Sequence, residues 1–293
     1  MKKECIFIDV FTDVPYAGNQ LAVFPHADDL TGEQMQRLAN EINYSETTFI
    51  LKSSEPGADF DIRIFTIKRE LLFAGHPTLG TAYSIMNIFD IWREKKDILR
   101  LKTGVGIIPL EGKDDSIWMT QNEPEFINQY SDKKEIASLI NLLPEDISDN
   151  SPIEDVSTGA NVLIIPLKNL HAIQHASGNV NNLKKFFKER KSGGPYLFSL
   201  ETTRPNVQVH SRFFAPHIGI IEDPATGSAA GPLTAYLLKH NIFGESFEIA
   251  NEQGIEMGRP SMIFMKGDKR GNTYTVKIGG KSAYVGRGEF EIT

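Results

Sequence analysis

The stretch Pro77-Thr-Leu-Gly-Thr-Ala-Tyr-Ser-Ile-Met-Asn-Ile-Phe89 contains no charged residue, and neither does Ala225-Thr-Gly-Ser-Ala-Ala-Gly-Pro-Leu-Thr-Ala-Tyr-Leu-Leu238. Both stretches predict helices. A helix that has no polar face has to be buried on all sides. Because most of the remaining segments predict strands, we expect an α+β fold in which a barrel-like sheet wraps around each of these two central helices.

Short runs rich in Ile, Val, Phe and Thr predict the strands. They are Cys5–Val10, Leu21–Phe24, Thr48–Leu51, Phe60–Phe65, Val105–Leu110, Val162–Pro166, Gln208–Phe214 and Tyr274–Ile278. Thr31 predicts the cap of a further helix, and Lys133–Leu143 and Asn182–Glu189 predict charged surface helices. The run Gln253–Ser261 predicts a strand that ends in a turn.

The composition excludes several classes of protein. With 31 basic and 38 acidic residues in 293, the net charge is −7, which provides no general attraction to nucleic acid. No apolar run approaches the ~18 residues of a membrane span. The single cysteine, Cys5, allows neither an internal disulfide nor a multi-thiolate metal site, and its apolar neighbours indicate a core position. We therefore expect a cytoplasmic protein with no membrane or nucleic-acid partner.

Three pairs of segments recur in the same order about half the chain apart. They are Gly18–Pro25 with Gly159–Pro166, Arg63-Ile-Phe with Arg212-Phe-Phe, and His76-Pro-Thr-Leu-Gly-Thr-Ala with Asp223-Pro-Ala-Thr-Gly-Ser-Ala. This repetition predicts a duplication and two pseudo-symmetric domains with a cleft between them. We place the domains at 1–120 and 121–293, with the boundary in the polar stretch after Met119. The last ~15 residues either stay in the second domain or return to the first.

His76 and Asp223 each precede a proline, a residue that favours the first helical position. We therefore expect both side chains at the lips of their helices, just outside free backbone N–H groups that suit a carboxylate. Gly80 and Gly227 would let a ligand approach the main chain closely. The helix dipole would favour a neutral His76. Taken singly, such an Asp is usually a cap and such a His structural, but their symmetric placement favours function.

Other site signatures are weaker or missing. His171 and His175 have helical spacing for a metal, but no carboxylate accompanies them, so no metal site is expected. The glycine-rich nucleotide motifs and Gly-x-Ser-x-Gly are absent. Glu46 stands at the entrance to an apolar strand, where it is either an ordinary edge carboxylate or, near His76, a general base and then a general acid.

Four blocks of sequence resemble the phenazine-biosynthesis isomerase (PhzF-like) family over nearly the whole chain. They are Gly18-Asn19, Ser45-Glu46-Thr47, Gly75-His76-Pro77-Thr78-Leu79-Gly80 and Glu222-Asp223-Pro224-Ala225-Thr226-Gly227-Ser228-Ala229. The resemblance implies the fold of diaminopimelate epimerase, with two pseudo-symmetric domains. That epimerase has a catalytic cysteine at each helix mouth, whereas this chain has His76 and Asp223 there. Gln20 follows Asn19, where many family members have proline.

The resemblance also implies roles for the site residues. Glu46 would move a proton on a small, cyclic amino-acid-like substrate, with His76 and Asp223 as catalytic partners that orient it. Asn19, Ser228 and the backbone N–H groups near Gly75 and Gly227 would bind the substrate and its carboxylate. No metal or organic cofactor is implied, and a homodimer is expected.

Two other functions stay open on the sequence. An amino-acid epimerase or racemase would need a second base on the opposite face of the substrate. A non-catalytic binding or scaffold protein would keep the cleft without turnover, and it should tolerate Glu46→Gln.

Overall fold

The computed structural model of the chain describes residues 1–89, 98–188, 190 and 192–292. Two compact units are present. One runs from Met1 to Met119 and takes in the C-terminal residues from Gly279 onward, and the other is Thr120–Ile278. The domain ranges 1–120 and 121–293 stay a prediction about folding units.

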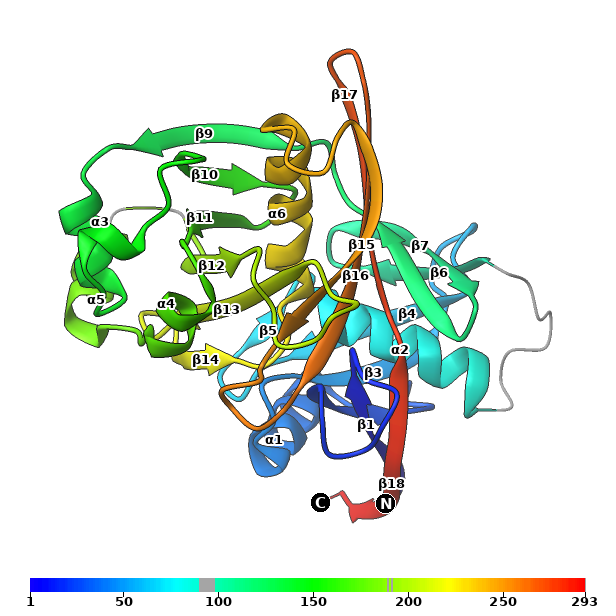
Figure 1. Cartoon of the computed structure of the whole chain (residues 1–293). Helices are drawn as coiled ribbons and strands as arrows, with labels where there is room; N and C mark the ends of the chain where they lie inside the picture. The colour runs from blue at the N-terminus through cyan, green and yellow to red at the C-terminus, as the bar shows by residue number, and fades with distance from the viewer. Residues whose placement is uncertain (90–97, 189, 191, 293) are drawn as a thin grey trace. The chain divides into compact units, whose positions relative to one another are not determined.

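In its described residues, the first unit combines many short strands with helices α1 and α2 (Figure 1). Its elements are β1 (Lys2–Val10), β2 (Asn19–Phe24), α1 (Gly32–Ile42), β3 (Thr47–Lys52), β4 (Phe60–Phe65), β5 (Glu70–Leu71), α2 (Gly75–Asn87), β6 (Ile98–Thr103), β7 (Gly106–Lys113), β8 (Ser116–Thr120) and β18 (Ser282–Glu291). Strand β1 pairs antiparallel with β2 and with β18, which brings the C-terminal segment back to the first strand.

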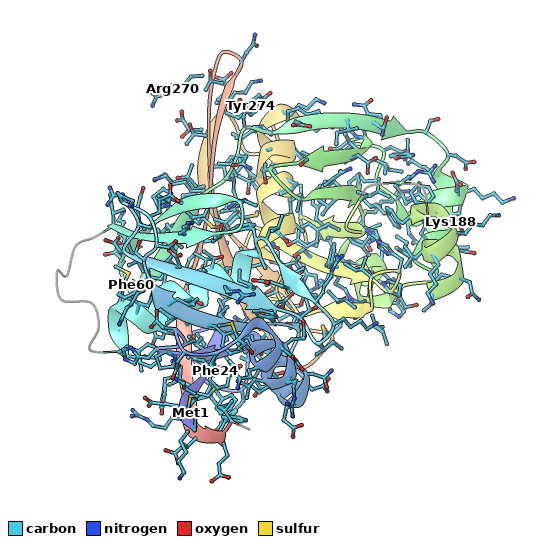
Figure 2. The ribbon with its side chains drawn as sticks, turned by 180° about the vertical axis from the view of Figure 1, so that it is seen from behind. Met1, Phe24, Phe60, Lys188, Arg270 and Tyr274 are labelled. Carbon is cyan, nitrogen blue, oxygen red and sulfur yellow. The ribbon has the colours of Figure 1, made fainter. Side chains whose placement is uncertain are left out.

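The second unit has a longer set of elements (Figure 1). They are β9 (Glu125–Tyr130), α3 (Lys133–Leu139), the 3₁₀ turn η1 (Pro144–Asp146), β10 (Ile153–Ser157), β11 (Asn161–Pro166), α4 (Leu170–His175), α5 (Val180–Phe187), β12 (Pro195–Ser199), β13 (Val209–Ala215), β14 (Ile220–Asp223), α6 (Gly227–Lys239), β15 (Ser246–Gln253), β16 (Ser261–Arg270) and β17 (Thr273–Gly280). Arg270 and Tyr274 lie at the turn between β16 and β17 (Figure 2).

The order of strand pairings in the first unit recurs in the second. In the first, β1–β2 is antiparallel, β2–β3 is parallel, β3–β4 and β4–β5 are antiparallel, and β4–β6 is parallel across α2. In the second, β10–β11 is antiparallel, β11–β12 is parallel, β12–β13 and β13–β14 are antiparallel, and β13–β15 is parallel across α6. Helices α2 and α6 therefore occupy the same place in the two pairing orders.

The two uncharged stretches form helices α2 and α6, each of 13 residues and buried along most of its length, as predicted. Helix α2 packs on β1, β2, β3 and β6 of its own unit, and α6 packs on β10, β11 and β16 of its own. The hydroxyl groups of two buried threonines are satisfied inside their helices, because Thr81 donates to Pro77 O at 2.7 Å and Thr234 to Ala230 O at 2.8 Å.

A second apolar layer lies on the other face of the first unit's strands. Adjacent residues of a strand point to opposite faces. The hydroxyl oxygen of Thr48 in β3 lies 2.8 Å from that of Thr81 in α2, whereas Phe49 packs with Phe24, labelled in Figure 2, and with Met35 of α1. Strand β3 therefore has α2 on one side and α1 on the other.

The eight strands predicted from composition are present, with ends shifted by a few residues. The run Gln253–Ser261, predicted as a strand that ends in a turn, is instead the turn between β15 and β16. The helix cap predicted at Thr31 is present, and Thr31 forms a capping box with Gln34. Helix α3 ends at Leu139, earlier than the predicted Leu143, because Asn141 adopts a left-handed conformation with φ of 53°. Helix α5 spans Val180–Phe187, and the predicted last residue of that helix, Glu189, lies outside the described residues.

The expectation that proline opens both central helices is wrong. Helix α2 begins at Gly75, so His76 is its second residue and Pro77 its third. Proline loses no bond there, since the first N–H groups of a helix have no intrahelical acceptor. Helix α6 begins at Gly227 after the N-cap Thr226, three residues beyond Pro224. His76 therefore lies inside the first turn of its helix, whereas Asp223 ends strand β14.

Candidate active site

Glu46 of the first unit lies at the entrance to β3. The preceding helix α1 ends because Asn43 takes a left-handed conformation, with φ of 59°, and redirects the chain toward the strand. Since side chains alternate along an extended segment, Glu46 faces the same side as Thr48, which is the side of α2. The carboxyl group is thus directed at the helix that contains His76, and Glu46 is buried.

The structure brings Asn19, Glu46 and His76 together. The Nε2 atom of His76 lies 3.6 Å from Oε2 of Glu46, and its Nδ1 atom lies 3.4 Å from Nδ2 of Asn19. All three residues are buried. Asn19 reaches this position as the first residue of β2, where it pairs with Val10 of β1.

The contact with Asn19 selects one tautomer of His76. The Nδ2 group of an asparagine only donates hydrogen bonds, so Nδ1 of the ring has to accept. In a neutral imidazole the proton then resides on Nε2, the atom that faces Glu46. His76 is thereby oriented as a donor toward the carboxyl group. Whether the ring is neutral, as its helix position predicts, stays a prediction.

Burial raises the pKa of the Glu46 carboxyl above its ordinary value of 4.5, and the hydroxyl group of Ser45 opposes this rise without cancelling it. Desolvation has this effect because a low-dielectric surrounding disfavours the charged form. A carboxyl group that titrates closer to neutral pH is better matched to both halves of a proton transfer.

Asp223 of the second unit is the last residue of β14, where it pairs with Phe213. One of its carboxyl oxygens, Oδ2, accepts a hydrogen bond from the Thr226 hydroxyl at 2.6 Å, and its backbone oxygen accepts one from Gln253 Nε2 at 2.8 Å. The side chain is buried but carries a short, directed bond. Its position is therefore set by α6 on one side and β15 on the other.

Gly227 and Ser228 occupy the first turn of α6. Their N–H groups precede the first bonds of the helix, which Ala229 and Ala230 donate to Thr226 O at 3.0 Å. Ser228 is the one partly exposed residue between Ala225 and Ala230. This turn therefore combines backbone donors with an accessible hydroxyl group, which is suitable for a carboxylate.

Gly75 begins α2 and is buried, but the expected role of Gly80 is wrong. A Cβ atom at Gly80 would lie 2.6 Å from Val10 Cγ2 and 2.7 Å from Leu21 Cδ2, so this glycine allows α2 to pack closely on β1 and β2. It approaches strands of its own unit because the helix is buried on all sides.

Sequence reasoning missed the residues that surround Asp223. Tyr196, Asn251 and Gln253 are fully buried, and Thr226 is nearly so. Gln253 is the first residue of the run predicted as a strand that ends in a turn, and nothing in its neighbours distinguishes it from an ordinary strand residue. Its importance depends on which segments β15 pairs with.

Charged groups form a chain in the second unit, in which His210, Glu252 and Arg212 are buried and Glu222 and Glu256 are partly exposed. Burial lowers the pKa of His210, but hydrogen bonds with Glu252 at 2.8 Å and Glu256 at 3.0 Å outweigh it and raise this pKa to about 9. Oε2 of Glu256 lies 3.8 Å from Nε of Arg212, which forms a two-bond fork with Glu222 at 2.8 Å. The chain ends beside Asp223, the residue after Glu222.

The remaining candidates take no part in these groups. His171 and His175 stack with ring centroids 4.1 Å apart, and His175 Nδ1 lies 2.8 Å from His171 O. Across the described residues, no cluster of three or more His, Cys, Asp or Glu side chains has a geometry that could hold a metal ion. Among the helices described, none is both long enough and apolar enough to cross a membrane.

Comparison with known proteins extends these observations. The chain is 38% identical over 289 residues to the trans-2,3-dihydro-3-hydroxyanthranilate isomerase of Pseudomonas fluorescens, covering 97% of each protein. A solved Bacillus anthracis phenazine biosynthesis protein of the PhzF family superposes with a TM-score of 0.91 at 31% identity, covering 100% of both chains. A hydroxyproline epimerase of Agrobacterium vitis shares the fold alone, with a TM-score of 0.62 at 9% identity, over 99% of this chain and 91% of that one.

The chain has a mixed α/β fold with a buried carboxyl–imidazole pair, and its relatives include trans-2,3-dihydro-3-hydroxyanthranilate isomerases. The protein is therefore an isomerase. The chain belongs to the phenazine biosynthesis-like family, PhzC-PhzF, whose model matches residues 8–288.

Proposed function

We propose that the protein is an isomerase that moves a proton between two carbons of a small, carboxylate-bearing, cyclic amino-acid-like substrate. The observation that carries this proposal is the buried Glu46 carboxyl, whose pKa is raised and which lies 3.6 Å from His76. Ionised Glu46 takes the proton from an acidic C–H bond, and the electron pair moves into the conjugated system. The same group, now protonated, returns the proton to another carbon.

The neighbours of Glu46 support this sequence of steps. His76, oriented by Asn19, directs its Nε2–H toward Oε2 of Glu46 and so positions the carboxylate that takes the proton. The proposed reaction needs no metal or organic cofactor, because one carboxyl group accepts and returns the proton. Cys5 does not serve as the base, since burial raises the pKa of its thiol.

In the second unit we assign Asp223 as a catalytic partner that orients the substrate, and we assign substrate binding to Gly227 and Ser228. The first turn of α6 would hold the carboxylate through its N–H groups and the Ser228 hydroxyl. Asp223 would accept from the amino or hydroxyl group of the substrate. Gly75 has the corresponding position at the start of α2 in the first unit.

We also propose that the two units arose by duplication and are pseudo-symmetric domains. The recurring order of strand pairings supports this, as does a two-bond Arg–Glu fork in each unit. Arg63 of β4 binds Glu70 of β5, and Arg212 of β13 binds Glu222 of β14. Homodimer formation and a cytoplasmic location stay predictions.

The test is proton exchange in D2O followed by NMR. Trans-2,3-dihydro-3-hydroxyanthranilate and a panel of small cyclic amino and hydroxy acids are incubated with the wild type, with Glu46→Gln and with Glu41→Gln. Glu41 is exposed on α1 and provides a matched control. We expect deuterium in one compound with the wild type and with Glu41→Gln, and a loss of at least ~100-fold with Glu46→Gln.

The position of the label separates the alternatives. Deuterium at a new carbon supports the isomerase, whereas deuterium at the original carbon with inversion supports an epimerase. Ligand binding by all three proteins with neither exchange nor formation of an isomerised product supports a binding protein. Equal exchange by Glu46→Gln and wild type would show that Glu46 is not the acid/base.

A further inference from the structure

The side-chain amide of Gln253 uses every hydrogen bond that it can form. A glutamine amide has two N–H donors and an oxygen with two acceptor positions. Nε2 donates to Asp223 O at 2.8 Å and to Thr226 Oγ1 at 2.9 Å, while Oε1 accepts from Thr226 N at 3.2 Å and from Tyr196 Oη at 2.9 Å. The residue is completely buried, and the partners determine which end of the amide is nitrogen.

The bonds between side chains run in one direction, from Asn251 to Asp223. Asn251 Nδ2 donates to Tyr196 Oη at 2.9 Å, and Tyr196 donates its only proton to Gln253 Oε1. Gln253 Nε2 donates to Thr226 Oγ1, so the Thr226 hydroxyl proton is directed to Asp223 Oδ2 at 2.6 Å. Each donor is thereby assigned, and the chain of bonds ends on the carboxyl group of Asp223.

The backbone beside Gln253 is fitted to the same segment. Gly254 has φ of 74°, and a Cβ atom there would lie 2.5 Å from Pro224 O. Gln253 itself stands opposite Ser211 in the parallel pairing of β13 and β15, and Ser211 Oγ lies 3.0 Å from Tyr196 Oη. The end of β15 therefore contacts residues 223–226 through both side chain and main chain.

We infer that Gln253 is a positioning residue for the reaction, because it fixes the carboxyl group of Asp223 and the first turn of α6 in one geometry. This inference rests on the proposed function of Asp223. Gln253 acts through Thr226 and the Asp223 backbone. Displacing a binding group by about 1 Å costs on the order of 100-fold in rate, so an amide with three bonds to residues 223–226 has a large effect on turnover.

The pH dependence of turnover in the variant Gln253→Glu distinguishes a positioning role from a purely structural one. Glutamate has the same shape as glutamine, but its carboxylate has no donor for Asp223 O or Thr226 Oγ1. When protonated, it has one O–H donor and still accepts. Turnover by Gln253→Glu should therefore recover as pH falls, relative to the wild type at the same pH.

The experiment compares wild type, Gln253→Glu and Gln253→Met by kcat, KM and pH profile, with folding checked by circular dichroism at each pH. Gln129→Glu and Gln129→Met are the matched controls, since Gln129 is exposed on β9 and bonds only weakly to Glu154 at 3.3 Å. At neutral pH we expect kcat of both Gln253 variants to fall roughly 10- to 100-fold with KM changed less than about threefold. The controls should match the wild type.

Hydrogen exchange of the Thr226 backbone N–H provides a test that is independent of activity. This group donates to Gln253 Oε1 in the wild type, so its exchange should accelerate in Gln253→Met. If wild-type protein has no turnover, the proposed function fails, and the exchange result still decides whether Gln253 holds this turn.

Two results would overturn the inference. One is unchanged kcat in both Gln253 variants. The other is a Gln253→Glu profile parallel to that of the wild type across the pH range in which both are folded. If Gln253→Met does not fold, the isosteric Gln253→Glu alone decides, since its shape preserves the packing.

Discussion

The two Arg–Glu forks provide an internal comparison between a buried and an exposed ion pair. Arg212 and Glu222 have side chains only 7% and 14% exposed, whereas Arg63 and Glu70 are 34% and 41% exposed. Arg212 also donates through Nη1 to the carbonyl oxygens at the end of α4, at 3.0 Å to Ile173 O and 2.6 Å to Ala176 O. The same fork is thus embedded in very different surroundings.

Replacing each arginine by methionine removes the charge and retains most of the apolar stem. Arg212→Met leaves the Glu222 carboxylate and the α4 carbonyl groups without their donor, and breaking a buried pair in this way costs about 3–5 kcal/mol. Arg63→Met breaks a pair that water can replace, at a cost of about 0–1 kcal/mol. We therefore expect Arg212→Met to be less stable than Arg63→Met by about 2–5 kcal/mol.

Urea unfolding followed by circular dichroism measures both free energies. The slope of the transition has to match that of the wild type, because the chain has two compact units that could unfold separately. Equal losses in the two variants, or a loss below about 1 kcal/mol for Arg212→Met, would refute the reasoning from burial.

Three further predictions concern single residues. Because burial raises the pKa of Glu46, its ionised form opposes folding, so Glu46→Gln should unfold at a higher urea concentration than wild type near neutral pH, and the difference should vanish as pH falls toward 4.5. The pKa of His210 is raised to about 9, so wild-type stability should fall as pH rises from 6.5 through 9, and His210→Gln should lose this slope in the same urea titrations. Gly80→Ala should cost about 1–3 kcal/mol in thermal or urea unfolding through its contacts with Val10 and Leu21, whereas Gly286→Ala, which meets no atom within 4 Å, should change stability by about 0.5 kcal/mol or less.

Much of the fold follows from local pattern. The absence of charge in two stretches predicts α2 and α6, and strand composition predicts the strands, because both depend on which side chains can be removed from water. The motifs also single out Asn19, Glu46 and His76, which the structure brings together. His76 lies 3.4 Å from Asn19 and 3.6 Å from Glu46. Their catalytic roles stay proposals.

Helix starts were predicted less well. The proline rule placed Pro77 and Pro224 at first helical positions, yet α2 begins two residues before one and α6 three residues after the other. Proline only restricts the backbone nearby, and packing of the buried helix decides where the first turn forms.

The amino-acid sequence by itself determined the two buried helices, the family and the residues that the family motifs mark. Only the tertiary structure decided that Gln253 donates a hydrogen bond to Asp223, thirty residues earlier in the sequence. It also decided that Arg212 and His210 belong to one chain of charged groups. The reason is physical: these contacts depend on the parallel pairing of β13 with β15, which sets Ser211 opposite Gln253. Strand register is a property of the assembled sheet, and the residues next to Gln253 in the sequence do not predict it.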